Sequence, residues 1–258
     1  MIDSRRGGRQ VPLPRDWIVP EWATPRGIVA FTTTRNGPDG IANLDLGGAF
    51  LEPRVASALA PFLPAAPVWQ KQMHGITVTT LTAVNLDSVR TEPPRADALV
   101  TKLAGVPLAV KHADCLPILL SAADGRVIAA VHAGWRGLAA GIVEATIAAM
   151  GVAAGSTKLT LVAWLGPAIG PAAFEVGPDV VDAFCTQDRG AMAAFVATGP
   201  GKWHADLYQL ARQRLAARGV TAIAGGSLCT VTEGARFFSH RRDRDPRRMA
   251  TFIHRAEP

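Results

Sequence analysis

Two histidines and one cysteine of this chain are residue types that can share one metal ion. They occur in three separate stretches, Gln72-Met73-His74-Gly75, His112-Ala113-Asp114-Cys115 and His132-Ala133-Gly134-Trp135-Arg136-Gly137. Imidazole nitrogens and a thiolate sulfur together bind Zn²⁺ or Cu. A structural zinc site uses four protein ligands, whereas a set of three leaves a coordination position for water or substrate. His74, Cys115 and His132 therefore predict a catalytic metal centre.

A β-hairpin would bring two of these three residues together. The strand-like runs 116–121 and 127–131 are joined by a short link that contains Asp124-Gly125, a strong turn signal. With these two residues as the turn, positions whose numbers sum to 249 face each other. Cys115 and His132 are then diagonal neighbours on one face, with backbones about 7–8 Å apart. Side chains that reach about 2.0–2.3 Å from a common ion can span that gap.

The remaining candidates are less well placed by sequence alone. His74 comes from another part of the chain, and a histidine in a Met-His-Gly turn is more often a hydrogen-bonded loop residue than a ligand. His112 has the opposite parity to Cys115, so a regular strand would point it to the other face and into core packing. Cys115 taken alone would more often be a small buried apolar residue. Its neighbour Asp114 and its hairpin partner His132 favour the functional interpretation.

The stretch that follows His132 could hold an anion. A strand ends at Val131, a glycine-rich turn follows, and a helix opens near Gly137. Exposed amides at a helix N-terminus favour anions, and Arg136 would add a bidentate donor for phosphate or carboxylate. The alternative is a tight connection in which the glycines only relieve steric crowding.

The composition predicts a globular protein of a reducing compartment. The chain has 258 residues, of which 48% are hydrophobic, enough for a sizeable core. No run approaches the roughly eighteen uncharged apolar residues of a membrane span. The polar N-terminus lacks the apolar stretch of a secretory signal. Three cysteines are an odd number, which argues against a disulfide framework and favours the cytoplasm.

The formal net charge of +6 is unevenly distributed. Seven arginines between Arg236 and Arg255 are set against Asp243 and Asp245. Such a segment is more often a solvated face or an anion pocket than a nucleic-acid site, because no stacking surface of interleaved aromatic and basic residues is visible. We therefore expect no nucleic-acid partner and no membrane partner, and a small phosphate-bearing or nucleotide-like substrate fits the charge.

The order of elements indicates an α+β fold with mixed β-sheets layered against helices. Strand-like runs occur at 28–33, 76–81, 98–101, 107–111, 116–121, 127–131, 159–164 and 249–253. Helices are predicted at 138–150 and at 206–218, between the N-cap residue Asp206 and Gly219, and a weaker one at 178–184. Strands outnumber helices and do not alternate regularly with them, which disfavours a doubly wound parallel sheet. We expect a loosely structured segment at 1–25 and a single domain at 26–258.

Six motifs of the chain, read in order, resemble those of a known bacterial family. They are Gln72-Met73-His74-Gly75, Arg95-Ala96-Asp97-Ala98, Ala113-Asp114-Cys115-Leu116-Pro117, Val131-His132-Ala133-Gly134-Trp135-Arg136-Gly137, Trp164-Leu165-Gly166-Pro167-Ala168-Ile169-Gly170-Pro171 and Phe237-Phe238-Ser239-His240-Arg241-Arg242-Asp243. The series is similar to that of the YfiH/laccase-domain family, whose members have been called polyphenol oxidase, peptidoglycan editing factor and purine nucleoside phosphorylase. The resemblance runs from about Thr33 to Phe252.

This resemblance implies an α+β fold and a zinc site, with copper as the alternative metal, whose ligands are His74, Cys115 and His132. It also implies a pocket formed with the help of Arg35, Asn43, Gln72, Asp114 and Arg136. The implied reactions are phosphorolysis of adenosine, inosine, guanosine and S-methyl-5′-thioadenosine and deamination of adenosine. The implied partners are thus a purine nucleoside and phosphate. Two positions depart from the family pattern, because His112 replaces a common threonine and 43–50 lacks the usual histidine-containing continuation.

Within this resemblance Cys115, His132 and Asp114 are the candidate catalytic residues. Deamination needs a metal-activated water to attack C6 of adenine, with Asp114 as the proton shuttle. Phosphorolysis needs phosphate, held by Arg136 and the helix N-terminus, to attack C1′ of the ribose.

Three other functions are left open by the sequence. Cys115 could be the nucleophile and His132 the base of a cysteine hydrolase acting on peptidoglycan precursors, since a thiolate beside an imidazole is an activated nucleophile. A copper-dependent polyphenol oxidase (laccase) needs several coppers, but the chain has only six histidines and no His-x-His pair. A zinc-stabilised binding module would unfold when its metal is removed. The sequence fits a monomer and a small homo-oligomer equally well.

Overall fold

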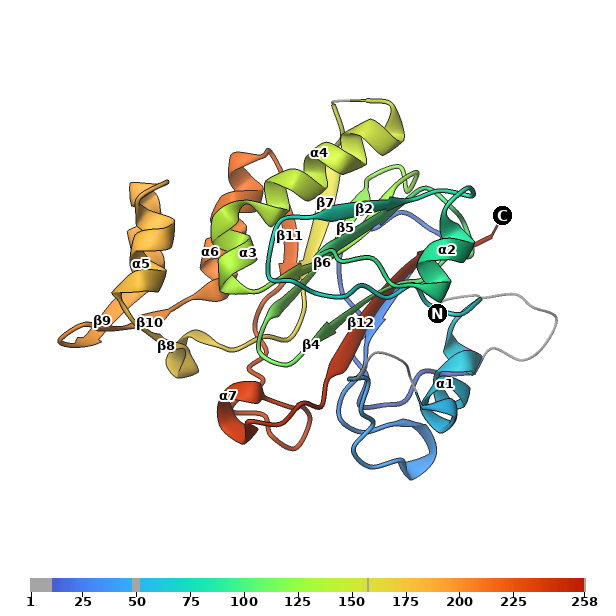
Figure 1. Ribbon diagram of the computed structural model, residues 1–258, viewed down its shortest axis with the longest axis horizontal. Helices are drawn as coiled ribbons and strands as arrows, with labels where there is room; N and C mark the ends of the chain where they lie inside the picture. Colours follow the sequence, from blue (N-terminus) through green and yellow to red (C-terminus); the bar gives the residue numbers. More distant parts are fainter. Residues whose placement is uncertain (1–10, 48–51, 157, 258) are drawn as a thin grey trace.

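A six-stranded mixed sheet forms the centre of the computed structural model, which describes residues 11–47, 52–156 and 158–257 (Figure 1). The strand order is β11-β7-β5-β6-β3-β2, with β2–β3 and β7–β11 parallel and the other neighbours antiparallel. Its strands are β2 (Val78–Leu81), β3 (Ala98–Thr101), β5 (Leu116–Ala122), β6 (Ile128–Ala133), β7 (Leu161–Leu165) and β11 (Ala222–Gly225). All residues of β3, β5, β6 and β7 are buried, because other layers cover both faces of the sheet.

A three-stranded antiparallel sheet packs on one face of the central sheet. It has the order β1 (Ile28–Thr32), β12 (Met249–Arg255), β4 (Leu108–His112). Alternate residues of β4, such as Val110, pack toward the central sheet against side chains such as Leu119. Because β5 follows β4 directly, the short link 113–115 carries the chain from one sheet to the other.

Helices cover the opposite face of the central sheet. They are α3 (Trp135–Ala140), α4 (Ile142–Ala154) and α6 (Leu207–Ala217), which bury apolar side chains against the alternate residues of β3, β5, β6 and β7 (Figure 1). The predicted helix at 138–150 is broken in two, because Gly141 has a φ of +105° and its left-handed conformation ends α3. α6 begins as predicted.

The outer elements complete the molecule. α1 (Pro53–Leu59) lies over the outer face of the three-stranded sheet, where an apolar cluster also includes Trp17 and Leu44. At one end of the molecule a small sheet of order β8-β10-β9 lies beside α5 (Figure 1). The remaining bounds are β8 (Glu175–Val176), β9 (Phe195–Gly199), β10 (Lys202–Ala205), α2 (Leu86–Thr91), α5 (Pro178–Cys185) and α7 (His240–Asp243), with 3-10 helices at Pro38–Gly40, Ala60–Phe62, Pro171–Ala173 and Arg189–Ala194.

The α+β class predicted from the sequence is confirmed, and each predicted strand is present with its ends shifted by at most a residue or two. Of the segment 1–25, residues 1–10 lie outside the described residues. Residues 11–25 form no helix or strand, yet Trp17 is buried and Ile18 bridges to Thr32. Within the described residues, no helix combines the length and the apolar character that crossing a bilayer requires.

Candidate metal centre

The β5–β6 hairpin has the register that the turn signal predicted. Pro117 faces His132, and the paired residues of this ladder, from Leu116 and Ala133 to Ser121 and Ile128, have numbers that sum to 249. The loop turns at Gly125, whose φ of +73° is the left-handed conformation that favours glycine. Cys115 lies one residue before β5 and beside Gly134, since a Cβ placed on Gly134 would be 3.1 Å from Cys115 Sγ. The hairpin thus sets Cys115 and His132 close together.

The structure brings all three predicted ligands into one cluster. One donor atom each from His74, Cys115 and His132 lies within 4.8 Å of the other two. Cys115 Sγ is 3.9 Å from His74 Nε2, and the two imidazole rings stand nearly perpendicular with centroids 4.8 Å apart. His132 is buried, Cys115 is half-buried and His74 is exposed. The cluster is therefore closed on the protein side and open to solvent at His74.

Asp97 contacts both of the segments that carry the histidines of this cluster. Its carboxylate is fully buried and lies 2.9 Å from His132 Nδ1. It also accepts hydrogen bonds from the backbone N–H groups of Met73, His74 and Gly75, at 2.8 to 3.2 Å. The sequence interpretation gave Asp97 no role, although its motif was noted. Only the pairing of β3 with β6, which brings the Asp97 carbonyl to the His132 amide at 2.7 Å, reveals it.

The donor set fits one metal ion. In a tetrahedral site with bonds of about 2.0–2.3 Å, neighbouring nitrogen and sulfur donors stand about 3.6 Å apart, close to the 3.9 Å between His74 Nε2 and Cys115 Sγ. His132 Nδ1 is hydrogen-bonded to Asp97, which leaves Nε2 of the same ring to bind the ion. Among the described residues, no second group of three His, Cys, Asp or Glu donors lies this close together. The site is thus suited to a single ion with three protein ligands.

Burial and neighbouring charges shift the ionisation of these groups. Burial would raise the pKa of the Cys115 thiol, but the charge and hydrogen bonding of His132 and His74 lower it below its ordinary value. Burial would lower the pKa of His132, but Cys115 and Asp97 raise it. Burial would raise the pKa of Asp97, but the hydrogen bonds from His132 and the loop amides lower it. The sulfur is therefore favoured as the thiolate, the form that binds metals and attacks electrophiles.

Backbone strain is concentrated at the predicted site residues. The described non-glycine residues with positive φ are Asn43, His74, Asp114 and Arg244. Three of these were singled out from the sequence, and the φ values of His74 and Asp114 are +58° and +88°. Left-handed conformations of non-glycine residues are costly and are kept where surrounding contacts hold them, often at functional sites. The strain supports a functional role for this region.

Asp114 is already engaged by two hydrogen bonds. Its carboxylate accepts one from the Thr230 hydroxyl at 2.5 Å and one from the backbone N–H of Arg241 at 2.6 Å. It is buried, with 9% of its surface exposed. It thus anchors the 230 and 241 segments beside Cys115, and the ligand cluster itself does not include it.

The predicted substrate-binding residues Gln72, Arg35 and Asn43 make hydrogen bonds to other parts of the chain. Gln72 donates from Nε2 to the carbonyl of Lys111 at 2.7 Å, which ties the His74 loop to β4. Arg35 donates to the Asn43 side chain at 2.6 Å and to the Gly234 carbonyl at 2.8 Å. Within the described residues, no hydrogen bond joins Arg35 or Asn43 to His74, Cys115 or His132.

Arg136 is exposed and stacks on Trp135, with its guanidinium carbon 4.2 Å from the ring centroid. It stands at the start of α3, two residues after Gly134. α3 is only six residues long, so its N-terminus offers a weaker anion site than the sequence suggested. The positive charge that faces solvent here is that of Arg136 itself.

His112 packs in the core, as its parity predicted. It is 1% exposed, its Nε2 is hydrogen-bonded to the Thr251 hydroxyl at 2.9 Å, and its Nδ1 has no hydrogen-bond partner among the described residues. Burial, together with the charges of His132 and Arg248, lowers its pKa to about 3. His112 is therefore a neutral buried imidazole outside the ligand cluster.

The C-terminal arginines serve largely as structural anchors. Arg242 donates to the carbonyls of Thr230, Val231 and Phe237 and pairs with Asp243. Other pairs join Arg236 to Glu233 and Arg247 to Asp245. Their charges are thus partly neutralised within the segment.

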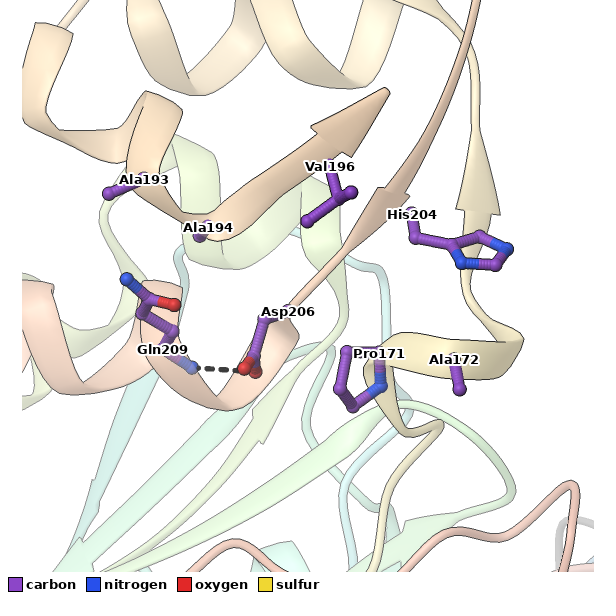
Figure 2. A pocket seen from close by; sticks show the side chains of 8 residues that line it. All are labelled: Pro171, Ala172, Ala193, Ala194, Val196, His204, Asp206 and Gln209. Carbon is purple, nitrogen blue, oxygen red and sulfur yellow. Dashed lines mark hydrogen bonds between the residues drawn. The ribbon is translucent and has the colours of Figure 1, made fainter. Parts of the chain in front are cut away.

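A separate pocket of about 270 Å³ lies beside the start of α6 (Figure 2). Small apolar side chains from the 3-10 helices Pro171–Ala173 and Arg189–Ala194 form much of its wall, together with His204, Asp206 and Gln209. Asp206 is used to cap α6 through the Gln209 amide. No residue predicted for the functional site lines this pocket.

Comparisons with known proteins agree with the motif series. Residues 53–256 match the family described as Multi-copper polyphenol oxidoreductase laccase. The chain is 45% identical over 246 residues to Purine nucleoside phosphorylase YfiH of Escherichia coli (strain K12), covering 92% of this chain and 97% of the relative. It is 44% identical over 253 residues to a Purine nucleoside phosphorylase of Xylella fastidiosa (strain Temecula1), covering 91% and 95%. The crystal structure of Neisseria meningitidis protein NMB0706, of the family DUF152, has a TM-score of 0.81 at 39% identity and covers 94% of this chain and 100% of that one.

The sequence match and the structural match both extend over nearly the whole chain. The matched region contains the three residues of the ligand cluster and Asp97. The chain belongs to the YfiH/laccase-domain family.

Proposed function

We propose that this chain is a zinc-dependent purine nucleoside phosphorylase that also deaminates adenosine. Support comes from relatives named purine nucleoside phosphorylase that are 44% and 45% identical over more than nine tenths of both chains. The proposed substrates are phosphate and adenosine, inosine, guanosine or S-methyl-5′-thioadenosine. The reaction breaks the bond from the base nitrogen to C1′ and forms a bond from C1′ to a phosphate oxygen.

The convergence of His74, Cys115 and His132 is the observation that carries the proposal. Their donor atoms lie within 4.8 Å of one another, and the exposed side at His74 gives a substrate access. These three residues would hold the ion. When bound, a zinc ion supplies Lewis acidity beside a coordination position that the protein leaves open.

The neighbouring residues have proposed tasks that follow from their contacts. The exposed guanidinium of Arg136 attracts and orients phosphate. Arg35, Asn43 and Gln72 contact the nucleoside. For Asp114 to take or give a proton, its hydrogen bond to Thr230 or to the Arg241 amide must open first.

The test is to incubate the zinc-loaded protein with adenosine, with and without phosphate, and to separate the products. Phosphorolysis gives adenine and ribose 1-phosphate only when phosphate is present. Deamination gives inosine without phosphate, and with phosphate it gives inosine together with the hypoxanthine formed from it. Cys115→Ala should abolish both products, because it removes a ligand. Cys185→Ala is the matched control, since Cys185 lies at the end of α5 and outside the cluster. If the wild-type protein leaves all four nucleosides unchanged, the proposal is wrong.

A cysteine hydrolase acting on peptidoglycan precursors is the second candidate, and the proximity of Cys115 to His132 favours it. A metal on the sulfur would block a nucleophilic thiolate. Zinc that is stoichiometric and required for activity therefore supports the phosphorylase. Activity of zinc-free protein that iodoacetamide abolishes supports the hydrolase.

Two further alternatives are separated by metal analysis. A laccase would need several copper sites, but the described residues contain a single group of three suitable donors, so we propose zinc rather than copper. Oxidation of phenols by this chain should be weak and should disappear in copper-free protein. A zinc-stabilised binding module would unfold on chelation, whereas a catalytic zinc can be removed with the fold intact.

A further inference from the structure

We propose that Asp97 is the positioning residue of the metal centre, a single carboxylate that fixes both metal-binding histidines at once. The inference rests on the metal site of the proposed function and not on the identity of the substrate. Asp97 is fully buried, and no position of the chain was expected to fill this role.

One arm of the carboxylate sets the ring of His132. Asp97 Oδ1 is 2.9 Å from His132 Nδ1, and with both side chains buried, water does not compete for this bond. A carboxylate accepts a hydrogen bond and cannot donate one, so the proton of His132 resides on Nδ1. The lone pair of Nε2 is thereby held ready for the ion.

The other arm sets the loop that carries His74. The consecutive backbone N–H groups of Met73, His74 and Gly75 all point to the same carboxylate. Successive amides that converge in this way form a concave site for a negative charge. The loop includes His74 in a left-handed conformation, with φ +58°. The bonds from Asp97 hold the loop in this conformation despite its cost.

The two arms share atoms, which links the two histidines. Oδ1 accepts from both the His74 amide and His132 Nδ1, while Oδ2 accepts from Gly75. A displacement of Asp97 therefore moves both ligands relative to Cys115. Loss of a carboxylate that orients a metal-binding histidine weakens metal affinity by about 10–100-fold.

Asp97→Asn is the variant that tests this role. Asparagine keeps the volume but has a single acceptor oxygen, so in either orientation its NH₂ faces a donor of one arm. We expect zinc to bind about 10–100-fold more weakly in competition with a chromophoric chelator. We also expect the visible spectrum of the cobalt-substituted protein to change, because the ligand geometry is altered. Asp206→Asn is the matched control: Asp206 also accepts a backbone N–H, from Gln209, and its variant should bind zinc as the wild type does.

Unchanged zinc affinity together with an unchanged cobalt spectrum in Asp97→Asn would overturn the proposal. A measurement on the wild-type protein covers the case in which the variant does not fold. With ¹⁵N-labelled histidine, NMR of the zinc-loaded protein should show the His132 proton on Nδ1. A proton on Nε2 would also overturn the proposal. Neither measurement uses a nucleoside, so a failed phosphorolysis assay and a failed role for Asp97 are distinguishable.

Discussion

A single methyl group at Gly134 should be enough to damage the metal centre. A Cβ on this residue would stand 3.0 Å from His74 Cδ2 and 3.1 Å from Cys115 Sγ. The backbone itself accepts alanine without strain, since φ is −64° and ψ is 155°. Gly134→Ala therefore leaves the local backbone conformation allowed and disturbs the two ligands.

The size of the effect follows from these contacts. Carbon atoms in normal contact are about 3.5–4.0 Å apart, so the methyl group would push His74 and Cys115 away by a few tenths of an ångström. Metal–ligand distances are typically kept within about 0.2 Å. We expect a loss of affinity like that from removing a supporting residue, about 10–100-fold, which is about 1.4–2.7 kcal/mol.

The assay is a titration of metal-free protein with zinc against a competing chelator, with circular dichroism to confirm the fold. Gly199→Ala is the matched control, because a Cβ at Gly199 would meet no atom within 4 Å. Zinc affinity of Gly134→Ala equal to that of the wild type would refute the reasoning, since the methyl group would then have found room that the structure does not contain.

Two further predictions concern stability. The buried His112 has a pKa of about 3 when folded, below its ordinary value of 6.5, so the unfolded state binds more protons and the free energy of unfolding should fall as the pH drops below 6.5. Urea unfolding at pH 7 and pH 5 should show a free energy of unfolding that depends less on pH for His112→Gln than for the wild type. An equal pH dependence in the two proteins would rule out His112 as its cause. Asp206→Ala removes the cap on the Gln209 amide and should cost about 1 kcal/mol, lowering Tm by about 2–4 °C with zinc affinity unchanged. An unchanged Tm would show that the cap adds no stability.

The hairpin half of the metal centre could be predicted from the sequence because its determinants are local. Asp124-Gly125 marks the turn, and the two flanking strands are adjacent in the chain, so the register followed from counting. That register brought Cys115 close to His132. The same parity argument placed His112 in the core, where the structure has it.

The other half could not be predicted from the residues themselves, because it depends on pairing between distant segments. His74 reaches the hairpin through Asp97, which precedes β3, and β3 pairs with β6. Spacing in the sequence carries no information on that pairing, so residue type could suggest His74 as a ligand but could not bring it to the hairpin. The helix at 138–150 was drawn through Gly141 because its apolar pattern continues, although the left-handed φ of that glycine breaks it. The strands β8 to β11 were not predicted from the sequence. They are short or largely exposed, so their apolar pattern is weak.

The link 113–115 gives the position of Cys115 a mechanical consequence. β4 belongs to the three-stranded sheet and β5 to the central sheet, so the sulfur sits where the chain crosses between them. His132 belongs to the central sheet, so an ion bound by both Cys115 and His132 would fix the link 113–115 to that sheet. Truncation of an apolar side chain packed between the two sheets, for instance that of Val110 or Leu119, would let the sheets shift relative to each other. It would thereby disturb the metal centre although neither residue belongs to it. The packing distance between the two sheets therefore affects the geometry of the metal centre.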